Sequence, residues 1–247
     1  MTHPVRPSPN HGPRPEGAPV DLVVIHYTAM TGGWGPSLKR LTEEASGVSA
    51  HWLIGEGGEC FQMVDERRRA WHAGVGVWGG DGDVNSRSIG IELSNDGASP
   101  FASAQMDALE ELLRGILHRH GIAPQGVIGH SCSAPGRKID PGPRFDWRRL
   151  ARSGLAVWSE PSPSAPMPAP DETTFRDDAR IAGFDAHQPI DILLHSVRLR
   201  HRPWLTGPLA PADMAVIADV ATRWPAAGHM RAWRSPLLDR RGRRGHA

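Results

Sequence analysis

The stretch "VDLVVIHYT" (residues 20–28) is a short apolar run that ends in His26. A continuous run of this kind, bounded by polar residues, predicts a buried strand. Two further stretches have the same character: "SRSIGIELSN" (residues 86–95), with Glu92 inside its apolar part, and "GVIGHS" (residues 126–131), which reaches His130. Because helical patterns separate these strands, the sequence predicts an α/β fold with a mixed β-sheet flanked by helices.

The clearest helical pattern is "SAQMDALEELLRGILHRHG" (residues 103–121). Ser103 is expected as its N-cap, and Gly121 stands where a glycine typically ends a helix. Ser37 is expected to cap a shorter helix. Between the two, "SAHWLIGEGGECFQMV" (residues 49–64) predicts a hairpin with its turn at the paired glycines.

Composition divides the chain into parts. "SEPSPSAPMPAP" (residues 159–170) is rich in proline and serine and predicts an extended linker. After it come three helical patterns at residues 175–182, 190–201 and 212–224, which form a module small enough to be marginal on its own. We therefore expect a disordered lead-in (1–18), a catalytic domain (19–158), a linker (159–171), a small three-helix module (172–228) and a basic tail (229–247).

Charge and hydropathy exclude several classes of protein. The chain has 28 basic and 27 acidic residues, so nothing indicates a nucleic-acid partner. It contains no run of the ~20 apolar residues that a membrane span needs, and the first residues lack an apolar signal segment. A cytoplasmic monomer is expected, with the periplasm as the alternative compartment. The two cysteines, Cys60 and Cys132, are expected as free thiols.

His26 and His130 both follow apolar strands, and strand ends of one sheet can face one spot. Asp140 lies ten residues after His130. Two imidazoles and a carboxylate leave one coordination position open, which is the composition of a catalytic zinc site. Cys132 competes for the third place, but its closeness to His130 in sequence would strain a tetrahedral ion, so we favour Asp140. Singly, a strand-end histidine is more often a core residue.

Glu92 is difficult to explain as a structural residue, because a carboxylate inside an apolar strand needs a partner or a raised pKa. Beside a metal it would serve as a general base. Lys138 would face the same way as Asp140 and could stabilise an oxyanion, although a lysine of this type usually faces solvent. His51 and His72 are further candidate ligands.

Six ordered motifs over about 130 residues resemble the zinc-dependent N-acetylmuramoyl-L-alanine amidases, the group that includes the anhydro-muropeptide amidases, phage T7 lysozyme and the peptidoglycan recognition proteins. The resemblance implies a mixed sheet flanked by helices, with a shallow groove over the zinc. The C-terminal part is more weakly similar to a small peptidoglycan-binding module. The motifs are "VVIHYTA", "SAHWLIGEGGE", "RAWHAGVGVWGG", "NSRSIGIELSN", "GVIGHS" and "PGRKIDPGPRFDW".

The resemblance implies that His26, His130 and Asp140 bind Zn²⁺ and that Glu92 and Lys138 are catalytic. Members similar to T7 lysozyme use a tyrosine where this chain has Ala50, so the chain resembles the glutamate-using branch. We expect an enzyme that cleaves the bond between N-acetylmuramic acid and L-alanine in peptidoglycan or muropeptides. The alternatives are a non-catalytic peptidoglycan recognition protein and a zinc peptidase acting elsewhere in the stem peptide. Expected substrate-binding residues are Trp71, His72, Asn85 and Arg87.

Overall fold

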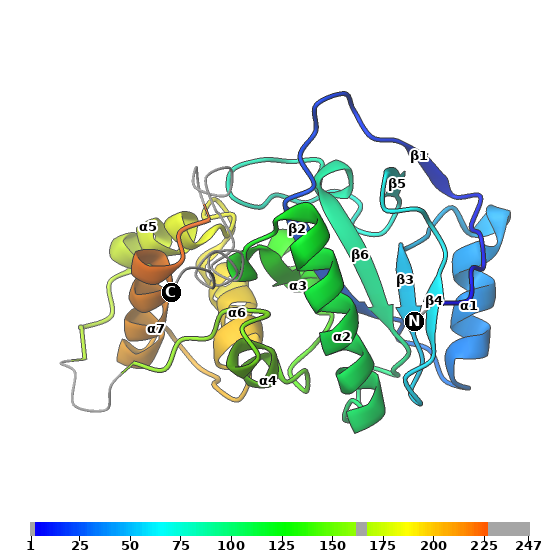
Figure 1. Cartoon of the computed structure of the whole chain (residues 1–247). Helices are drawn as coiled ribbons and strands as arrows, with labels where there is room; N and C mark the ends of the chain where they lie inside the picture. Colours follow the sequence, from blue (N-terminus) through cyan, green and yellow to red (C-terminus); the bar gives the residue numbers. More distant parts are fainter. Residues whose placement is uncertain (1–2, 162–166, 227–247) are drawn as a thin grey trace, which may run out of the picture.

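A five-stranded sheet in the order β4-β3-β6-β2-β7 forms the centre of the computed structural model, which describes residues 3–161 and 167–226 (Figure 1). Three of its four pairings are parallel, while β3 and β4 form the antiparallel hairpin expected from the sequence. The mixed sheet flanked by helices is therefore confirmed. The strands are β2 (Leu22–Tyr27), β3 (Trp52–Ile54), β4 (Cys60–Gln62), β6 (Ser88–Leu93) and β7 (Val127–Gly129).

Alternation along β2 and β6 divides their side chains between the two faces of the sheet. Apolar residues at odd positions, such as Val23 and Ile91, belong to the core on the first face. Residues at even positions belong to the second face, where Leu22 and Val24 join a different core. His26 and Glu92 are also at even positions and are direct register partners. The second face therefore carries both of these polar side chains, next to each other.

The first face is covered by α2 (Ser103–His120), which crosses the sheet in Figure 1, and by α4 (Trp147–Arg152). Gly121 ends α2 in the left-handed conformation, as the sequence predicts. The cap residue before α2 is Ala102 rather than Ser103, and α1 (Trp34–Thr42) begins three residues before the expected cap Ser37, which is buried inside that helix.

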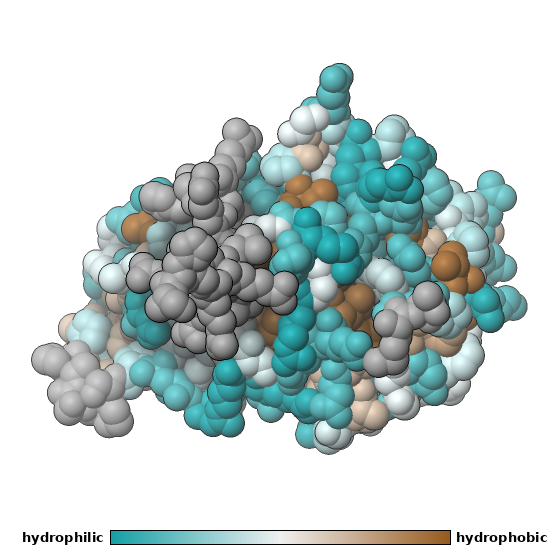
Figure 2. Space-filling view, viewed as in Figure 1, coloured by the Kyte–Doolittle hydropathy of each residue, from teal (hydrophilic) through white to brown (hydrophobic). Residues whose placement is uncertain are grey.

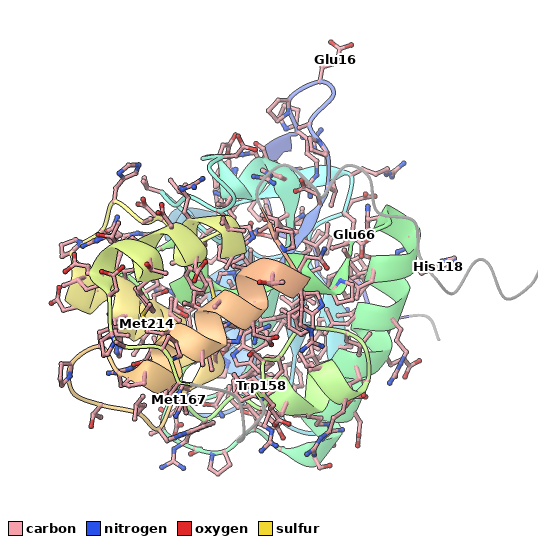
Figure 3. All side chains as sticks on the ribbon, turned by 90° about the vertical axis from the view of Figure 1, so that its left-hand side faces the viewer. Glu16, Glu66, His118, Trp158, Met167 and Met214 are labelled. Carbon is pink, nitrogen blue, oxygen red and sulfur yellow. The ribbon has the colours of Figure 1, made fainter. Side chains whose placement is uncertain are left out.

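The second face is covered from two sides. Helix α1 packs on the β3–β4 hairpin through a small core of its own. On the other side lie α3 (His130–Ser133), α5 (Glu172–Ala182), α6 (Ile190–His201) and α7 (Pro211–Arg223). Figure 3 looks onto α5 and α7 from outside. The last three are the helices predicted for the C-terminal module.

This C-terminal helical module shares a hydrophobic core with the sheet. Leu22, Val24 and Ile128 from the strands form one buried cluster with Phe175, Leu193 and other residues of the module helices. Cys132 in α3 belongs to the same cluster, and both cysteines are free, as expected. The module is thus a layer of the same folded body. The predicted basic tail (229–247) lies outside the described residues.

The N-terminal segment differs from the expected disordered lead-in, since residues 3–14 lie against the domain, while the loop around Glu16 projects from it (Figure 3). Strand β1 (His11–Pro13) pairs with β5 (Arg68–Ala70). The buried Ser8 hydroxyl donates to the Leu41 carbonyl at 2.6 Å, and Asn10 donates to the Glu43 carbonyl at 2.8 Å. Polar side chains and backbone groups hold this segment. Such contacts produce no apolar periodicity in the sequence, and the sequence therefore wrongly predicted disorder here.

Among the described residues, no helix combines the length and apolar character needed to cross a bilayer. Figure 2 shows that hydrophilic residues dominate the described surface on the side of α2, where apolar residues form small separate areas. The described surface visible in this view therefore presents no extended apolar patch of the kind that marks a large interface.

Candidate active site

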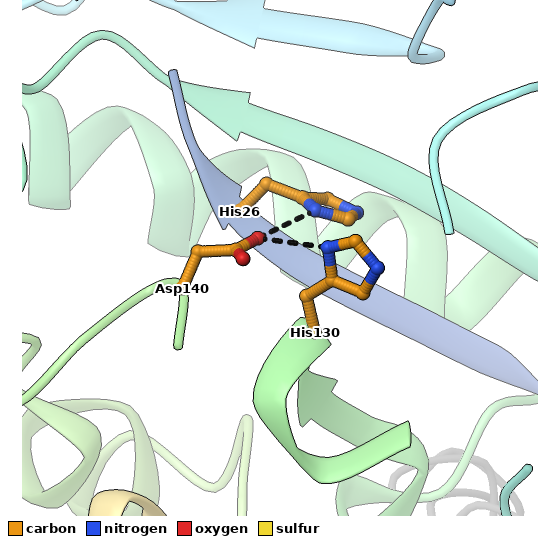
Figure 4. A group of neighbouring side chains, drawn as sticks. All are labelled: His26, His130 and Asp140. Carbon is orange, nitrogen blue, oxygen red and sulfur yellow. Dashed lines mark hydrogen bonds and ion pairs between the residues drawn. The ribbon is translucent and has the colours of Figure 1, made fainter. Parts of the chain in front are cut away.

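The three predicted metal ligands lie together at one edge of the sheet (Figure 4). His26 is the second-to-last residue of strand β2, and His130 is the first residue of α3, directly after the end of β7. Asp140 Oδ2 lies 2.8 Å from Nδ1 of His26 and 3.0 Å from Nδ1 of His130. All three residues are buried, and their donor atoms lie within 4.8 Å of one another.

The loop between α3 and α4 returns Asp140 to the two histidines. The amide of Ser131 donates to the Asp140 carbonyl at 2.9 Å, which joins the two ends of this loop. Gly136 and Gly142 have positive φ angles of 72° and 80°, which only glycine adopts easily. Cys132, the alternative ligand, faces the hydrophobic core and is fully buried there.

The partners of the two Nε2 atoms favour the tautomer in which each Nδ1 atom carries a lone pair. His130 Nε2 lies 2.9 Å from the carbonyl oxygen of Ala73, which only accepts, so the ring proton is on Nε2. His26 Nε2 lies 3.0 Å from Nδ1 of His72. Nε2 of His72 faces the Ser88 hydroxyl, so Nδ1 of His72 is the acceptor for the ring proton of His26. The lone pairs of two nitrogens and one carboxylate oxygen therefore converge on one point.

The charge state of this triad suits a cation. Burial, with the nearby His130, lowers the pKa of His26 to about 4, so its ring is neutral. Burial opposes the ionisation of Asp140, but contacts with His130 and His26 hold the pKa of this carboxyl below its ordinary value. Two imidazoles and an ionised carboxylate fit a divalent metal ion, which would take up the lone pairs of both Nδ1 atoms and leave one position for another ligand.

Glu92 lies on β6 beside His26 and lines the same pocket. Its Oε2 atom is buried and has no hydrogen-bond partner among the described residues. Burial, reinforced by the negative charge of Asp140 and opposed by Lys138, raises the pKa of Glu92 to about 8. A carboxyl group with such a pKa, facing a pocket, is suited to exchange a proton with a bound molecule.

The pocket in front of the triad has a volume of about 550 Å³. The predicted residues Lys138, Trp71 and His72 line it, together with residues that the sequence analysis did not select. Of these, Tyr27 directly follows His26 in the sequence. This adjacency is the only feature of the sequence that could have indicated that Tyr27 lines the pocket. The remaining ones come from α1 and nearby loops and include Met30 and Arg40.

Asn85 and Arg87, predicted to bind substrate, do not line this pocket. The buried Asn85 side chain accepts hydrogen bonds from the amides of His72 and Ala73, at 3.1 and 2.8 Å. Arg87 forms an ion pair with Asp21 at 2.9 Å, and its side chain is only 12% exposed. Both residues hold the chain around the pocket, and the structure does not bring them to the space in front of the triad.

Comparison with known proteins supports the geometric picture. The Amidase_2 family model, described as N-acetylmuramoyl-L-alanine amidase, matches residues 16–143. The amidase AmiD of Escherichia coli is 36% identical over 188 residues, which cover 70% of this chain and 62% of AmiD. The chain therefore spans less than two thirds of that relative. The 1,6-anhydro-N-acetylmuramyl-L-alanine amidase AmpD of Enterobacter cloacae is 36% identical over 160 residues, which cover 58% of this chain and 86% of AmpD.

Solved structures extend the likeness to the C-terminal helices. AmiD in complex with anhydro-N-acetylmuramic acid-L-Ala-D-γ-Glu-L-Lys has a TM-score of 0.73 and 31% identity, over 87% of this chain and 91% of AmiD. AmpDh3 of Pseudomonas aeruginosa has a TM-score of 0.74 and 29% identity, over 90% of this chain and 96% of AmpDh3. The structural similarity therefore covers more of the chain than the family model, which ends at residue 143.

Proposed function

Because the chain belongs to the N-acetylmuramoyl-L-alanine amidase family, we propose that it is a zinc-dependent hydrolase of muropeptides. The bond cleaved is the amide between the lactyl group of N-acetylmuramic acid and L-alanine. The observation that carries the proposal is the convergence of three donor atoms, from His26, His130 and Asp140, in a pocket that also contains Glu92.

Two imidazole nitrogens and one carboxylate oxygen are a ligand set used by catalytic zinc, with the fourth position open. When bound there, Zn²⁺ supplies a Lewis acid that polarises the scissile carbonyl and acidifies water. Its positive charge would also favour the ionised form of Glu92, whose pKa is raised in the isolated protein chain.

Glu92 is proposed to take the proton of the attacking water and deliver it to the leaving nitrogen of L-alanine. The register pairing of Glu92 with His26 on the same face of the sheet supports this role. Lys138, exposed at the pocket, would stabilise the negative charge that develops on the carbonyl oxygen. Trp71 is proposed to contact the glycan or the peptide from the pocket wall.

The substrate form that we favour is a soluble anhydro-muropeptide. Two relatives have been solved with such molecules, AmiD with an anhydro-muramyl tripeptide and AmpDh3 with an anhydromuramic pentapeptide. Cytoplasmic location would restrict the protein to such fragments, while a periplasmic protein would also meet intact murein. Fractionation of the producing cells, followed by immunodetection, tests which substrates are within reach.

The direct test is incubation of zinc-loaded protein with purified anhydro-muropeptide and mass analysis of the products. Release of the intact stem peptide, and its loss after chelation and recovery with added Zn²⁺, is the expected result. Binding without cleavage would identify a peptidoglycan recognition protein instead. Cleavage within the stem peptide would identify a zinc peptidase, and either outcome contradicts the proposal.

A further inference from the structure

His72 connects a metal ligand to the interior of the sheet. Its Nδ1 lies 3.0 Å from Nε2 of His26, and its Nε2 lies 3.2 Å from the hydroxyl oxygen of Ser88. The Ser88 hydroxyl in turn lies 2.6 Å from the carbonyl oxygen of Val84. These contacts form a continuous hydrogen-bonded chain from His26 to the backbone, which we call the His72–Ser88 relay.

The direction of every proton in the relay follows from its last member. The carbonyl of Val84 only accepts, so Ser88 donates its proton there and must accept from Nε2–H of His72. Nδ1 of His72 is then without a proton and accepts from Nε2–H of His26. As a result, the lone pair of His26 Nδ1 points toward Asp140, where a metal ion requires it.

The surrounding structure holds His72 in this position. Its ring lies on Gly90 of β6, where a Cβ atom would come within 2.4–2.7 Å of the imidazole, so no larger residue fits. Asn85 Oδ1 accepts from the His72 amide and fixes the backbone. Arg14, from the N-terminal segment, donates to the carbonyl of Ser88 at 2.9 Å. Strand β6, the segment around Asn85 and the N-terminal segment therefore together hold the His72–Ser88 relay in place.

We propose that His72 is a positioning residue, which together with Ser88 fixes the tautomer and ring orientation of His26 and so sets the metal affinity of the site. This inference rests on the metal site of the proposed function. It assigns His72 a role different from the substrate contact expected from the sequence. It also explains why β6 has serine, glycine and glutamate at successive positions of one face: Ser88 ends the relay, Gly90 accommodates it, and Glu92 reaches the pocket.

Loss of the relay changes which ring nitrogen of His26 carries the proton. Without an acceptor at His72, the Nε2–H tautomer of His26 loses its hydrogen bond, and the Nδ1–H tautomer competes with metal binding. Removal of the Ser88 hydroxyl has a similar but smaller effect, because His72 can then reverse its own tautomer. Neither change removes a metal ligand.

The test measures metal affinity by competition with a chelator, for both Zn²⁺ and Co²⁺. We expect H72L to weaken binding about 10- to 100-fold and S88A about tenfold, which is the usual range for partners of ligand histidines. H72N, which keeps an acceptor near His26, should recover part of the loss. The matched control is S8A, which removes another buried hydroxyl that donates to a carbonyl at 2.6 Å. Ser8 bonds to Leu41 and Asn10, outside the His72–Ser88 relay, so the metal affinity of S8A should equal that of the wild type.

Proton NMR of the Co²⁺-loaded protein provides a readout that general loosening would not change. The wild type should show two slowly exchanging, paramagnetically shifted ring N–H protons, from His26 and His130. In H72L the signal of His26 should be lost by solvent exchange, while that of His130, bonded to Ala73, should persist. Unchanged affinity, or equal loss of both signals, would overturn the relay. A wild-type protein that binds no metal would instead defeat the proposed function.

Discussion

Asp140 and Glu66 are two buried carboxylates with histidine neighbours, and they are exposed to nearly the same extent, 8% and 9%. Asp140 has the imidazoles of His26 and His130 at 2.8 and 3.0 Å. Glu66, labelled in Figure 3, has His120 at 2.7 Å and Arg119 at 2.7 Å. It also accepts a hydrogen bond from Trp52 at 2.9 Å. By residue types and distances alone, either cluster resembles a candidate ion site.

The two clusters differ in where the protons are. Every neighbour of Glu66 donates to it, so its charge is already satisfied by hydrogen bonds. The neighbours of Asp140 have other acceptors for their ring protons, the Ala73 carbonyl for His130 and the His72 ring for His26. Proximity of carboxylate and imidazole therefore does not define a metal site, whereas an excess of lone pairs over protons does.

Removal of Asp140 should have the largest effect. We expect D140A to lose stoichiometric zinc and all measurable amidase activity, because two imidazoles alone hold the ion weakly. In contrast, E66Q should retain both. Elemental analysis of the purified proteins and the muropeptide assay check this pair of outcomes, and zinc retention in D140A would break the distinction between the clusters.

Replacement of Glu92 comes next. E92Q should lower turnover about 10²- to 10⁴-fold, the usual contribution of a positioned general base, while zinc content stays at one per chain. Steady-state kinetics together with metal analysis separate the two quantities. If E92Q lost its zinc and regained activity on reconstitution, Glu92 would be a metal-supporting residue rather than the base.

The Glu66 cluster should contribute to stability in a pH-dependent way. Burial by itself opposes ionisation, but hydrogen bonds from His120 and Arg119 outweigh it and lower the pKa of Glu66 from 4.5 to about 2. Because the folded-state pKa is depressed, this stabilisation is complete above about pH 4.5 and is lost as the pH falls toward 2.

E66Q should therefore cost about 2–3 kcal/mol of unfolding free energy at pH 7 and much less near pH 2.5. Urea unfolding of both proteins at several pH values measures the difference. A pH-independent difference would show that packing, and not charge, accounts for the contribution of Glu66.

The smallest effect is expected for R119Q. The Arg119 side chain is 47% exposed and is only one of the three groups that donate to Glu66. Its loss should change the unfolding free energy by about 0–1 kcal/mol and leave zinc content unchanged. Thermal unfolding of the zinc-loaded protein is sufficient to check this, and a loss comparable to that of E66Q would mean that Arg119 alone satisfies the carboxylate.

Much of the fold could be predicted, because strands buried on both faces and amphipathic helices leave strong local patterns. The runs ending near His26 and His130 and the helix ending at Gly121 are examples. The proximity of His26, His130 and Asp140 was also anticipated, since strand ends meet at one edge and the family motifs place all three residues.

What the sequence did not reveal depends on contacts between distant segments. Ser8 and Arg14 hold the N-terminal segment through single polar bonds, which have no periodicity. Asn85 and Arg87 stand in a motif near the pocket, yet their side chains turn to the backbone of His72 and to Asp21. Only the three-dimensional arrangement distinguishes a residue that touches the pocket from one that shapes its wall.

The core that the sheet shares with α5, α6 and α7 has a consequence for the order of synthesis. The last strand of the sheet leaves the ribosome about 90 residues before the end of α7, which at 5–20 residues per second is a delay of roughly 5–20 s. During that interval the sheet has its first apolar face covered by α2, while Leu22, Val24 and Ile128 on the second face have no partners from the module. The nascent chain therefore completes its core only when the last helices arrive, and a chaperone has that interval in which to bind the uncovered face.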